Sequence, residues 1–262
     1  DARSTTYALN MPGTCKTCHS DNEYMKEYNI ATKQYDDYAG SVHGIALLEN
    51  QDTGAPACND CHGNHGAMPP GLTSISHVCG TCHVNNMEYF SESAMAEEFM
   101  ESDLHACEEC HGNHAVQKTN DDMIGSGEKS TCIECHDEGE EAYETAEQIH
   151  LDLKNLVTAY DSSSTLLKEV ERVGMDALEM SYAVKDAKQR LTQARTLVHT
   201  FDADQVKAKT DEGLKFTQDA FDLGVAQLKE LQFRRFGFGI ATFFMSIVLV
   251  ALYFKIKDIE KK

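Results

Sequence analysis

The chain has 262 residues, of which 43 are acidic and 23 are basic, so its formal charge is −20 at pH 7. A chain this acidic is repelled by phosphate backbones, which excludes nucleic acid as an expected partner and favours a partner with a basic face. The sequence begins at Asp1 without an apolar leader, and we therefore expect a mature protein whose secretion signal has been removed.

Ten cysteines form five copies of Cys-x-x-Cys-His, and no cysteine is left over. The cysteine pairs are Cys15 and Cys18, Cys58 and Cys61, Cys79 and Cys82, Cys107 and Cys110, and Cys132 and Cys135. The histidines that follow them are His19, His62, His83, His111 and His136. A zinc site or a disulfide framework would not require a histidine after the second cysteine of each pair.

This spacing is typical of c-type haem attachment, in which both thiols form thioethers with the porphyrin and the adjacent imidazole ligates the iron. The sequence therefore predicts five covalently bound haem c groups. Because such haems are attached on the outer side of the energy-conserving membrane, we expect the periplasm or an equivalent compartment.

An internal repeat runs through this part of the chain. The stretch YAGSVHGIAL at 38–47 aligns with FSESAMAEEF at 90–99, and each is followed by a nearly identical block, ACNDCHGNH or ACEECHGNH. Two units of two motifs therefore follow one another, with the fifth motif appended. In this alignment His43 corresponds to Met95 and His65 corresponds to His114, and we expect corresponding positions to have corresponding roles.

Seven histidines lie outside the motifs and are candidates for the sixth iron ligands. A histidine three residues after a proximal ligand cannot easily reach the distal side of its own haem. His65 and His114 are therefore predicted to ligate neighbouring haems, and His43 is predicted to be a sixth ligand as well.

Three further side chains are weaker candidates. His77 and His105 each lie two residues before a motif, and each either ligates iron or hydrogen-bonds a haem propionate. Met95 is either a thioether ligand, which would raise the potential of one haem, or a packing residue.

The composition changes after the fifth motif, and 143–212 contains no proline and one glycine, Gly174. Apolar residues recur there at alternating steps of three and four, with one slip between Val170 and Val173, which predicts an amphipathic helix. Asp202 and Gln205 have the spacing of a capping box and predict the start of another helix.

Length determines how these helices connect. As single helices, 145–199 would span about 82 Å and 203–235 about 50 Å, so a straight antiparallel pair does not match. We therefore expect a break at Gly174 and a three-helix stalk formed by 145–172, 175–199 and 203–235. His150 and His199 would then lie at the same end of the stalk, where either could reach a haem.

The segment 236–254 has 19 residues without a charge, or about 28 Å of helix, which is enough to cross a bilayer. It contains no His, Glu, Asp or Lys, so we expect it to offer neither a haem b ligand nor a proton relay. Since the haems must lie outside, we expect a single-pass protein of the inner, energy-conserving membrane, with the haem domain and stalk in the periplasm and a cytoplasmic C-terminus.

The CHGNH blocks and the S-x-H-G stretch resemble the cytochrome c3-like, paired-CxxCH multihaem family over about residues 14–136. That family has relatives among the tetrahaem quinol dehydrogenases of nitrate and nitrite respiration, whose membrane helix is N-terminal. The architecture also resembles membrane-anchored multihaem subunits that accompany cytochrome b and Rieske-type proteins in respiratory complexes. The resemblance implies electron transfer between such membrane subunits and a soluble carrier.

The expected fold is mainly α, with a loop-rich multihaem c-type domain at 1–140, a three-helix stalk at 141–235, a transmembrane helix at 236–254 and a cytoplasmic tail at 255–262. The expected function is that of a membrane-anchored pentahaem cytochrome c, an electron-transfer subunit that is not an enzyme on its own. It would pass electrons from a quinol-oxidising cytochrome b or Rieske-type partner to a soluble acceptor with a basic face.

Two alternatives remain. The chain could oxidise quinol directly, or it could be a multihaem reductase of nitrite or hydroxylamine. A reductase needs an open iron position, and seven spare histidines and Met95 for five haems argue against one.

Overall fold

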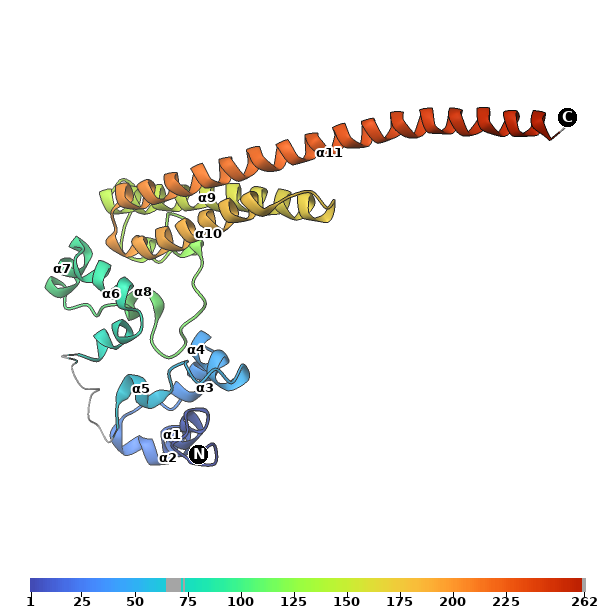
Figure 1. Cartoon of the computed structure of the whole chain (residues 1–262). Helices are drawn as coiled ribbons and strands as arrows, with labels where there is room; N and C mark the ends of the chain where they lie inside the picture. Colours follow the sequence, from blue (N-terminus) through green and yellow to red (C-terminus); the bar gives the residue numbers. More distant parts are fainter. Residues whose placement is uncertain (65–71, 73, 261–262) are drawn as a thin grey trace. The chain divides into compact units, whose positions relative to one another are not determined.

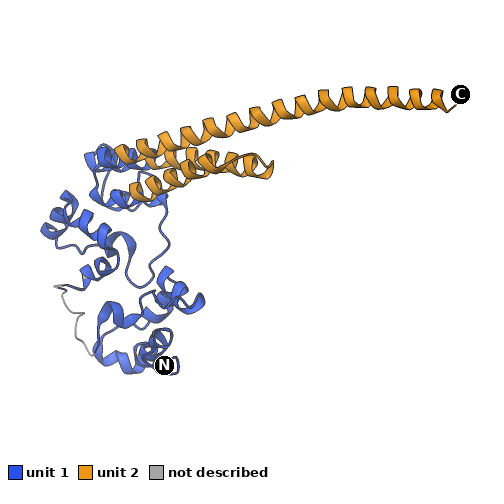
Figure 2. Ribbon diagram, viewed as in Figure 1, with its two compact units in different colours: residues 1–151, 195–206 blue, residues 152–194, 207–262 orange. Residues whose placement is uncertain are grey.

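The computed structural model describes residues 1–64, 72 and 74–260 (Figure 1). The chain is mainly helical, and the described residues contain no β-strand, in agreement with the mainly α fold predicted from the sequence. It divides into two compact units, Asp1–Leu151 with Arg195–Val206, and Asp152–Ala194 with Lys207–Lys262 (Figure 2).

The first unit contains short helices joined by loops, together with the adjoining ends of three long helices. Its short helices up to the second motif are η1 Ala8–Asn10, α1 Met11–His19, α2 Asn22–Met25, η2 Lys26–Tyr28, α3 Gln34–Ala39, α4 Val42–Gly44, η3 Ile45–Glu49 and α5 Cys58–His62. Those that follow are η4 Ile75–Thr81, α6 Val84–Ser91, α7 Ala94–Glu101, α8 Glu108–His111, η5 Asp121–Met123, η6 Cys132–Glu134 and η7 Val198–Thr200.

The sequence repeat is also a structural repeat. Ser41 begins α4 and Ser93 begins α7, and each hydroxyl oxygen accepts a hydrogen bond from the backbone N–H three residues later, at 3.0 Å and 3.3 Å. Each hydroxyl also donates to the carbonyl three residues before it. His43 and Met95 therefore occupy the same position, the second residue of a serine-capped helix.

The motif helices α5 and α8 end in the same way. Gly63 follows α5 with φ 69° and ψ −153°, and Gly112 follows α8 with φ 70° and ψ −177°. Only glycine adopts this region without strain. The glycine of each CHGNH block therefore ends the helix directly after the proximal histidine.

The three long helices are α9 Glu141–Arg172, α10 Leu178–Leu197 and α11 Ala203–Ile259. The expected break is present, because α9 ends two residues before Gly174, whose φ is +73°. Within the second unit the three helices run side by side (Figure 2). Val170 of α9, Met180 of α10 and Ala220 of α11 are buried together in one apolar core.

Asp202 begins α11, as predicted. The hydrogen bond of the Gln205 side chain, however, differs from that in a capping box, where it would go to the Asp202 backbone N–H. Its carboxylate accepts hydrogen bonds from the backbone N–H groups of Asp204 and Gln205, at 2.9 Å and 3.1 Å. The Gln205 side chain donates to the same carboxylate at 2.8 Å and does not bond the Asp202 N–H, because that N–H donates to the Thr200 hydroxyl. These hydrogen bonds, that of the Gln205 side chain first, lower the pKa of Asp202.

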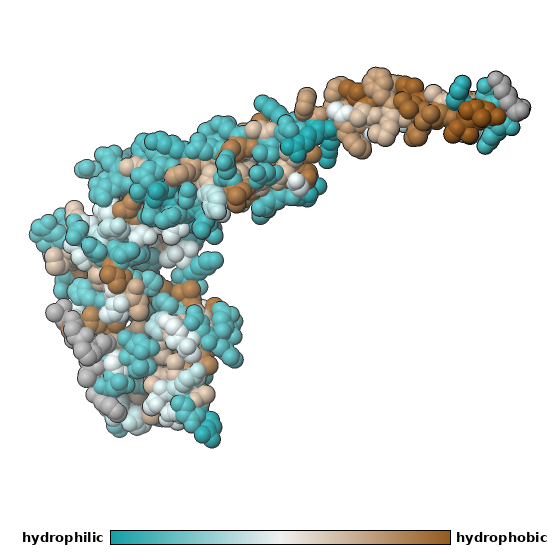
Figure 3. All heavy atoms as spheres, in the orientation of Figure 1, coloured by the Kyte–Doolittle hydropathy of each residue, from teal (hydrophilic) through white to brown (hydrophobic). Residues whose placement is uncertain are grey.

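The C-terminal part of α11 is long and apolar enough to cross a membrane. Its most apolar stretch has a mean hydropathy of 2.1, and none of the residues in that stretch is buried (Figure 3). The predicted span 236–254 lies inside this helix, which continues without interruption to Ile259. Residues 255–259 of the expected tail are therefore helical.

Candidate haem-binding sites

Each Cys-x-x-Cys-His motif lies in or beside a short helix of the first unit. The first, second and fourth motifs lie on α1, α5 and α8, and the third and fifth lie on the 3-10 helices η4 and η6. All ten cysteines are free thiols, each at least partly exposed. The thiols are therefore free to form thioethers, and none is held in a disulfide.

The second and fourth motifs begin with similar hydrogen bonds. The Asp60 carboxylate accepts from the N–H of Ala57, directly before the motif, at 2.7 Å, and the Glu109 carboxylate accepts from the N–H of His105, two residues before the motif, at 3.0 Å. In each case an acid inside the motif bonds a backbone N–H that precedes the first cysteine. This bond fixes the helical turn that carries the two thiols and the histidine.

Three pairs of imidazole rings face one another, and each pair joins a motif histidine to a histidine outside the motifs. The pairs are His43 with His83 at 6.3 Å between ring centroids, His62 with His114 at 5.7 Å, and His111 with His199 at 6.2 Å. The first two pairs contain the predicted ligands His43 and His114.

The spacing of these pairs fits two imidazoles on opposite sides of one metal ion. A metal–imidazole bond is about 2 Å long, and each ring centre lies about 1 Å beyond its nitrogen, which places two axial ring centroids about 6 Å apart. Aromatic rings in direct contact have centroids about 4.5–7 Å apart, so the same separations are also found between rings that touch without a metal ion. The residues present therefore fit an iron porphyrin held from both faces.

Burial favours the neutral form of three of these imidazoles, those of His43, His111 and His114. Burial, followed by the neighbouring His83, lowers the pKa of His43, and burial, followed by His62, lowers that of His114. The pKa of His111 is lowered by burial and by His199. A neutral imidazole is the form that binds a metal ion, since the coordinating nitrogen must carry no proton.

The first three motifs neighbour one another in sequence order. Burial, together with the neighbouring Cys15 of the first motif, raises the pKa of Cys58 to about 12. Burial and the neighbouring Cys79 and Cys82 of the third motif raise the pKa of Cys61. The second motif therefore lies between the first and the third.

The same order continues to the fifth motif. The interaction of Cys79 with Cys107 of the fourth motif lowers the pKa of Cys79 and raises that of Cys107. Burial and then Cys132 of the fifth motif raise the pKa of Cys110. The five attachment sites thus form a row in which each motif neighbours the next.

Four other predicted ligands have no second imidazole ring beside them among the described residues. His19 is exposed, and the Nδ1 of His136 lies 3.1 Å from a Glu140 carboxylate oxygen. His77 is exposed, as is His105, whose Nδ1 lies 3.2 Å from Glu109. Among the described residues no ring contact joins these four to a second histidine.

His65 lies outside the described residues, so its predicted role stays a prediction. Met95 is half-buried in α7. His150, on α9, is fixed through its Nδ1, which is 2.9 Å from the carbonyl oxygen of Asp121.

His199 is the side chain that sequence reasoning did not single out. The predicted antiparallel helices brought it to the same end as His150 but gave no reason to prefer it. The structure favours His199 because the α10–α11 turn lies beside the fourth motif. The spacing of residues within a helix does not predict where that turn lies.

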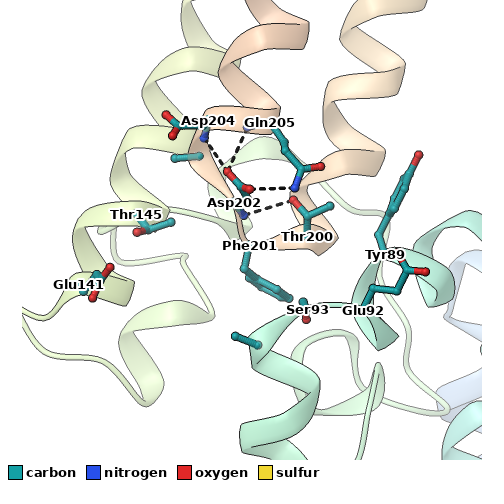
Figure 4. Close-up of a pocket in the computed structure, with 12 residues that line it drawn as sticks. Tyr89, Glu92, Ser93, Glu141, Thr145, Thr200, Phe201, Asp202, Asp204 and Gln205 are labelled. Atoms are coloured by element: carbon teal, nitrogen blue, oxygen red, sulfur yellow. Dashed lines mark hydrogen bonds between the residues drawn. The ribbon is translucent and has the colours of Figure 1, made fainter.

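A hollow of about 620 Å³ lies next to this turn (Figure 4). It is lined by the ends of α6 and α9 and by the residues around Asp202, and its acidic side chains are Glu92, Glu141, Asp202 and Asp204. It contains no motif residue and no predicted ligand. We therefore do not assign it to haem binding.

Within residues 1–64, 72 and 74–260, no group of three or more His, Cys, Asp or Glu side chains could hold a metal ion directly. Comparison of the chain with protein-family models, curated proteins and solved structures gave no match.

Proposed function

We propose that this chain is a membrane-anchored, periplasmic pentahaem cytochrome c that acts as the electron-transfer subunit of a quinol-oxidising complex. The observation that carries the proposal is that motif histidines face second imidazoles at a separation of about 6 Å, as in His43 with His83 and His62 with His114. Each such pair can hold one haem iron from both sides.

The facing pairs assign ligands to two haems. The second haem would be attached to Cys58 and Cys61 and held by His62 and His114. The third would be attached to Cys79 and Cys82 and held by His83 and His43. Both sixth ligands would come from outside the haem's own motif, as the CHGNH spacing predicts for His114.

The repeat extends this assignment to Met95. After His43 the chain passes the motif at Cys58 and then reaches the third motif, whose histidine, His83, is the one that His43 faces. After Met95 the chain passes the motif at Cys107 and then reaches the fifth motif, at Cys132, Cys135 and His136. Because Met95 occupies the helical position of His43, we propose its sulfur as the sixth ligand of the fifth haem. His65, His77 and His105 remain candidates for the first haem.

When bound, each haem carries one electron by cycling its iron between the ferric and ferrous states. The chain's contribution is to fill the axial positions and to arrange the carriers. Two protein ligands per iron leave no position for nitrite or hydroxylamine. The row of attachment cysteines favours a linear relay in sequence order.

The C-terminal helix supports the membrane part of the proposal. Its apolar segment would be the anchor, with α9, α10 and the start of α11 as the stalk and with the haems on the periplasmic side. Because 236–254 has no His, Asp, Glu or Lys to deprotonate a quinol, a cytochrome b or Rieske-type subunit would supply that step. The charge of −20 favours a soluble acceptor with a basic face.

Purification of the detergent-solubilised holoprotein tests the proposal. We expect a mass about 3 kDa above that of the polypeptide, for five haems, and spectra of predominantly low-spin, six-coordinate iron. A mass corresponding to four haems would contradict the count. A dominant high-spin signal that responds to nitrite or hydroxylamine would favour the reductase.

Reconstitution into liposomes tests the direction of electron flow. We expect rapid exchange with soluble carriers of basic charge and slow reduction by menaquinol analogues, because the membrane segment 236–254 has no His, Asp, Glu or Lys to deprotonate a quinol. Rapid, inhibitor-sensitive quinol oxidation by the isolated subunit would favour the direct quinol dehydrogenase. Identification of subunits that co-purify in mild detergent then tests the partner.

A further inference from the structure

We infer that His199, in the turn between α10 and α11, is the sixth iron ligand of the haem attached at Cys107 and Cys110. The inference rests on the proposed haem-binding function. It places one axial ligand in the helical part of the chain, outside the predicted haem domain at 1–140.

The first support is the geometry of the pair. The centroids of the His111 and His199 rings are 6.2 Å apart and their planes are inclined by 32°. The pair formed by the predicted ligand His43 and the motif histidine His83 is nearly the same, at 6.3 Å and 43°. Both separations match two imidazoles on opposite sides of one iron, which requires about 6 Å.

The second support is the hydrogen bonding of the His199 ring. Its Nδ1 lies 3.0 Å from the carbonyl oxygen of Thr196, so that nitrogen donates and Nε2 carries the free lone pair. Metal-ligating histidines commonly donate their second nitrogen to a backbone carbonyl, which fixes the tautomer and the ring orientation. The Asn86 amide lies 3.5 Å from Nε2, at the outer limit of a hydrogen bond.

The third support is that the turn is fixed on both sides. Phe201, two residues after His199, packs edge-on against Phe90 of α6 at 6.5 Å between centroids. Arg195, four residues before it, makes two hydrogen bonds of 2.8 Å and 2.7 Å to the Asp121 carboxylate. The position of His199 is therefore determined by packing and by a bidentate ion pair, as a ligand position requires.

The other candidates for the fourth haem fit less well. His105 is nearest in sequence, but its side chain is 68% exposed and its Nδ1 lies 3.2 Å from the Glu109 carboxylate. His150 is fixed by the Asp121 carbonyl, and among the described ring contacts it has no imidazole partner. His199 is partly buried and faces the proximal histidine directly.

The test uses the full-length holoprotein with His199→Ala and, as the matched control, His150→Ala. Both variants should retain five haems by mass. In His199→Ala one haem in five should change from low to high spin, bind carbon monoxide, and return to low spin with added imidazole. His150→Ala removes the other histidine from this end of the long helices and should keep the wild-type spectrum.

A second pair of variants assigns the spectral change to the fourth haem. It also distinguishes loss of the axial ligand from misfolding of the protein. His199→Met keeps an axial ligand, so all five haems should stay low-spin while the potential of one rises. In a Cys107→Ser, Cys110→Ser background, which lacks the fourth haem, His199→Ala should add no high-spin signal. A new high-spin haem in that background would overturn the assignment to this haem.

The outcomes separate this inference from the proposed function. Five low-spin haems in His199→Ala would overturn the inference and leave the pentahaem cytochrome unaffected. A wild-type protein without covalent haem would overturn both.

Discussion

The two parts of the chain differ in how they bury apolar residues. Among the described residues of 1–140, the buried apolar side chains are Met25, Leu47, Ala57, Ala96, Ala106 and Ile124, and half of them are alanines. The helical segments 152–194 and 207–235 contain fewer residues than 1–140. Their buried apolar side chains are Leu153, Leu156, Val170, Met180, Val184, Ala187, Leu191, Ala194 and Ala220. The helical part has a continuous core, and the first part has isolated buried positions.

This difference indicates what stabilises each part. Burial of apolar area stabilises by roughly 25 cal/mol per Å², so the helices have a source of stability in their own side chains. The first 140 residues have too few such side chains to offset the ordering of so many loop residues. On the proposed function, the covalent haems supply the missing apolar surface.

The largest expected effect comes from production of the full chain without haem attachment, in cells that lack the maturation system. We expect 1–140 to lose its fold while the helices of the second unit stay formed. Limited proteolysis with mass spectrometry should show cleavage throughout 1–140 and protection of 152–194. Equal protection of both parts would contradict the comparison.

Leu156→Ala tests the helical part alone. Leu156 is fully buried, so we expect a loss of about 2–5 kcal/mol in the unfolding of the helices, followed by far-ultraviolet circular dichroism. The haem absorption bands should not change. Leu151→Ala, at a position that is 43% exposed on the same helix, is the control and should cost under about 1 kcal/mol.

Gly112→Ala tests the first part through its backbone. An added Cβ meets nothing within 4 Å, so the cost of about 1–3 kcal/mol arises from the positive φ alone. Because Gly112 follows His111, we expect altered coordination of the fourth haem, visible as a partial high-spin signal. Gly127→Ala also adds its Cβ to open space, and a matching spectral change there would argue against backbone strain as the cause.

Met95→His tests the asymmetry between the two repeat units. Replacement of a thioether ligand by imidazole should lower the potential of one haem by on the order of 0.1 V, within the ~0.8 V range that axial ligands cover. A redox titration followed by optical absorption measures the change. An unchanged titration would make Met95 a packing residue. The converse variant, His43→Met, should raise one potential.

Asp202→Ala has the smallest expected effect, a loss of about 1 kcal/mol from the start of α11. The folded-state pKa of Asp202 is lowered, so its contribution is present above the unfolded pKa of 3.8 and is lost as the pH falls through the folded value. Wild type and variant should therefore unfold alike at strongly acidic pH and differ at neutral pH. Asp202→Asn keeps the cap and should retain most of the stability at pH 7.

The sequence was informative where a feature depends on neighbours in the chain. The break at Gly174, the start of α11 at Asp202 and the equivalence of His43 with Met95 follow from local spacing, and the structure has all three. The capping pattern was incomplete because the Thr200 hydroxyl competes for the Asp202 N–H.

Pairing between distant histidines was only partly predictable. The repeat and the CHGNH spacing selected His43 and His114, but they did not say which motif each would face. His150 and His199 were equivalent by helix geometry, and only tertiary packing of the turn against α6 separates them. A histidine's partner depends on loop conformation that a single sequence does not specify.

The position of His199 has a consequence for biogenesis. On the proposed topology, translocation would proceed from the N-terminus and carry all five attachment motifs across the membrane before the α10–α11 turn. A maturation enzyme that works on the emerging chain would therefore meet the fourth haem while its iron still lacks one axial ligand. The axial ligand of that haem would bind only after α10 and α11 have formed. A chain truncated before residue 199 would therefore lack this ligand, and one of its haem irons would bind carbon monoxide.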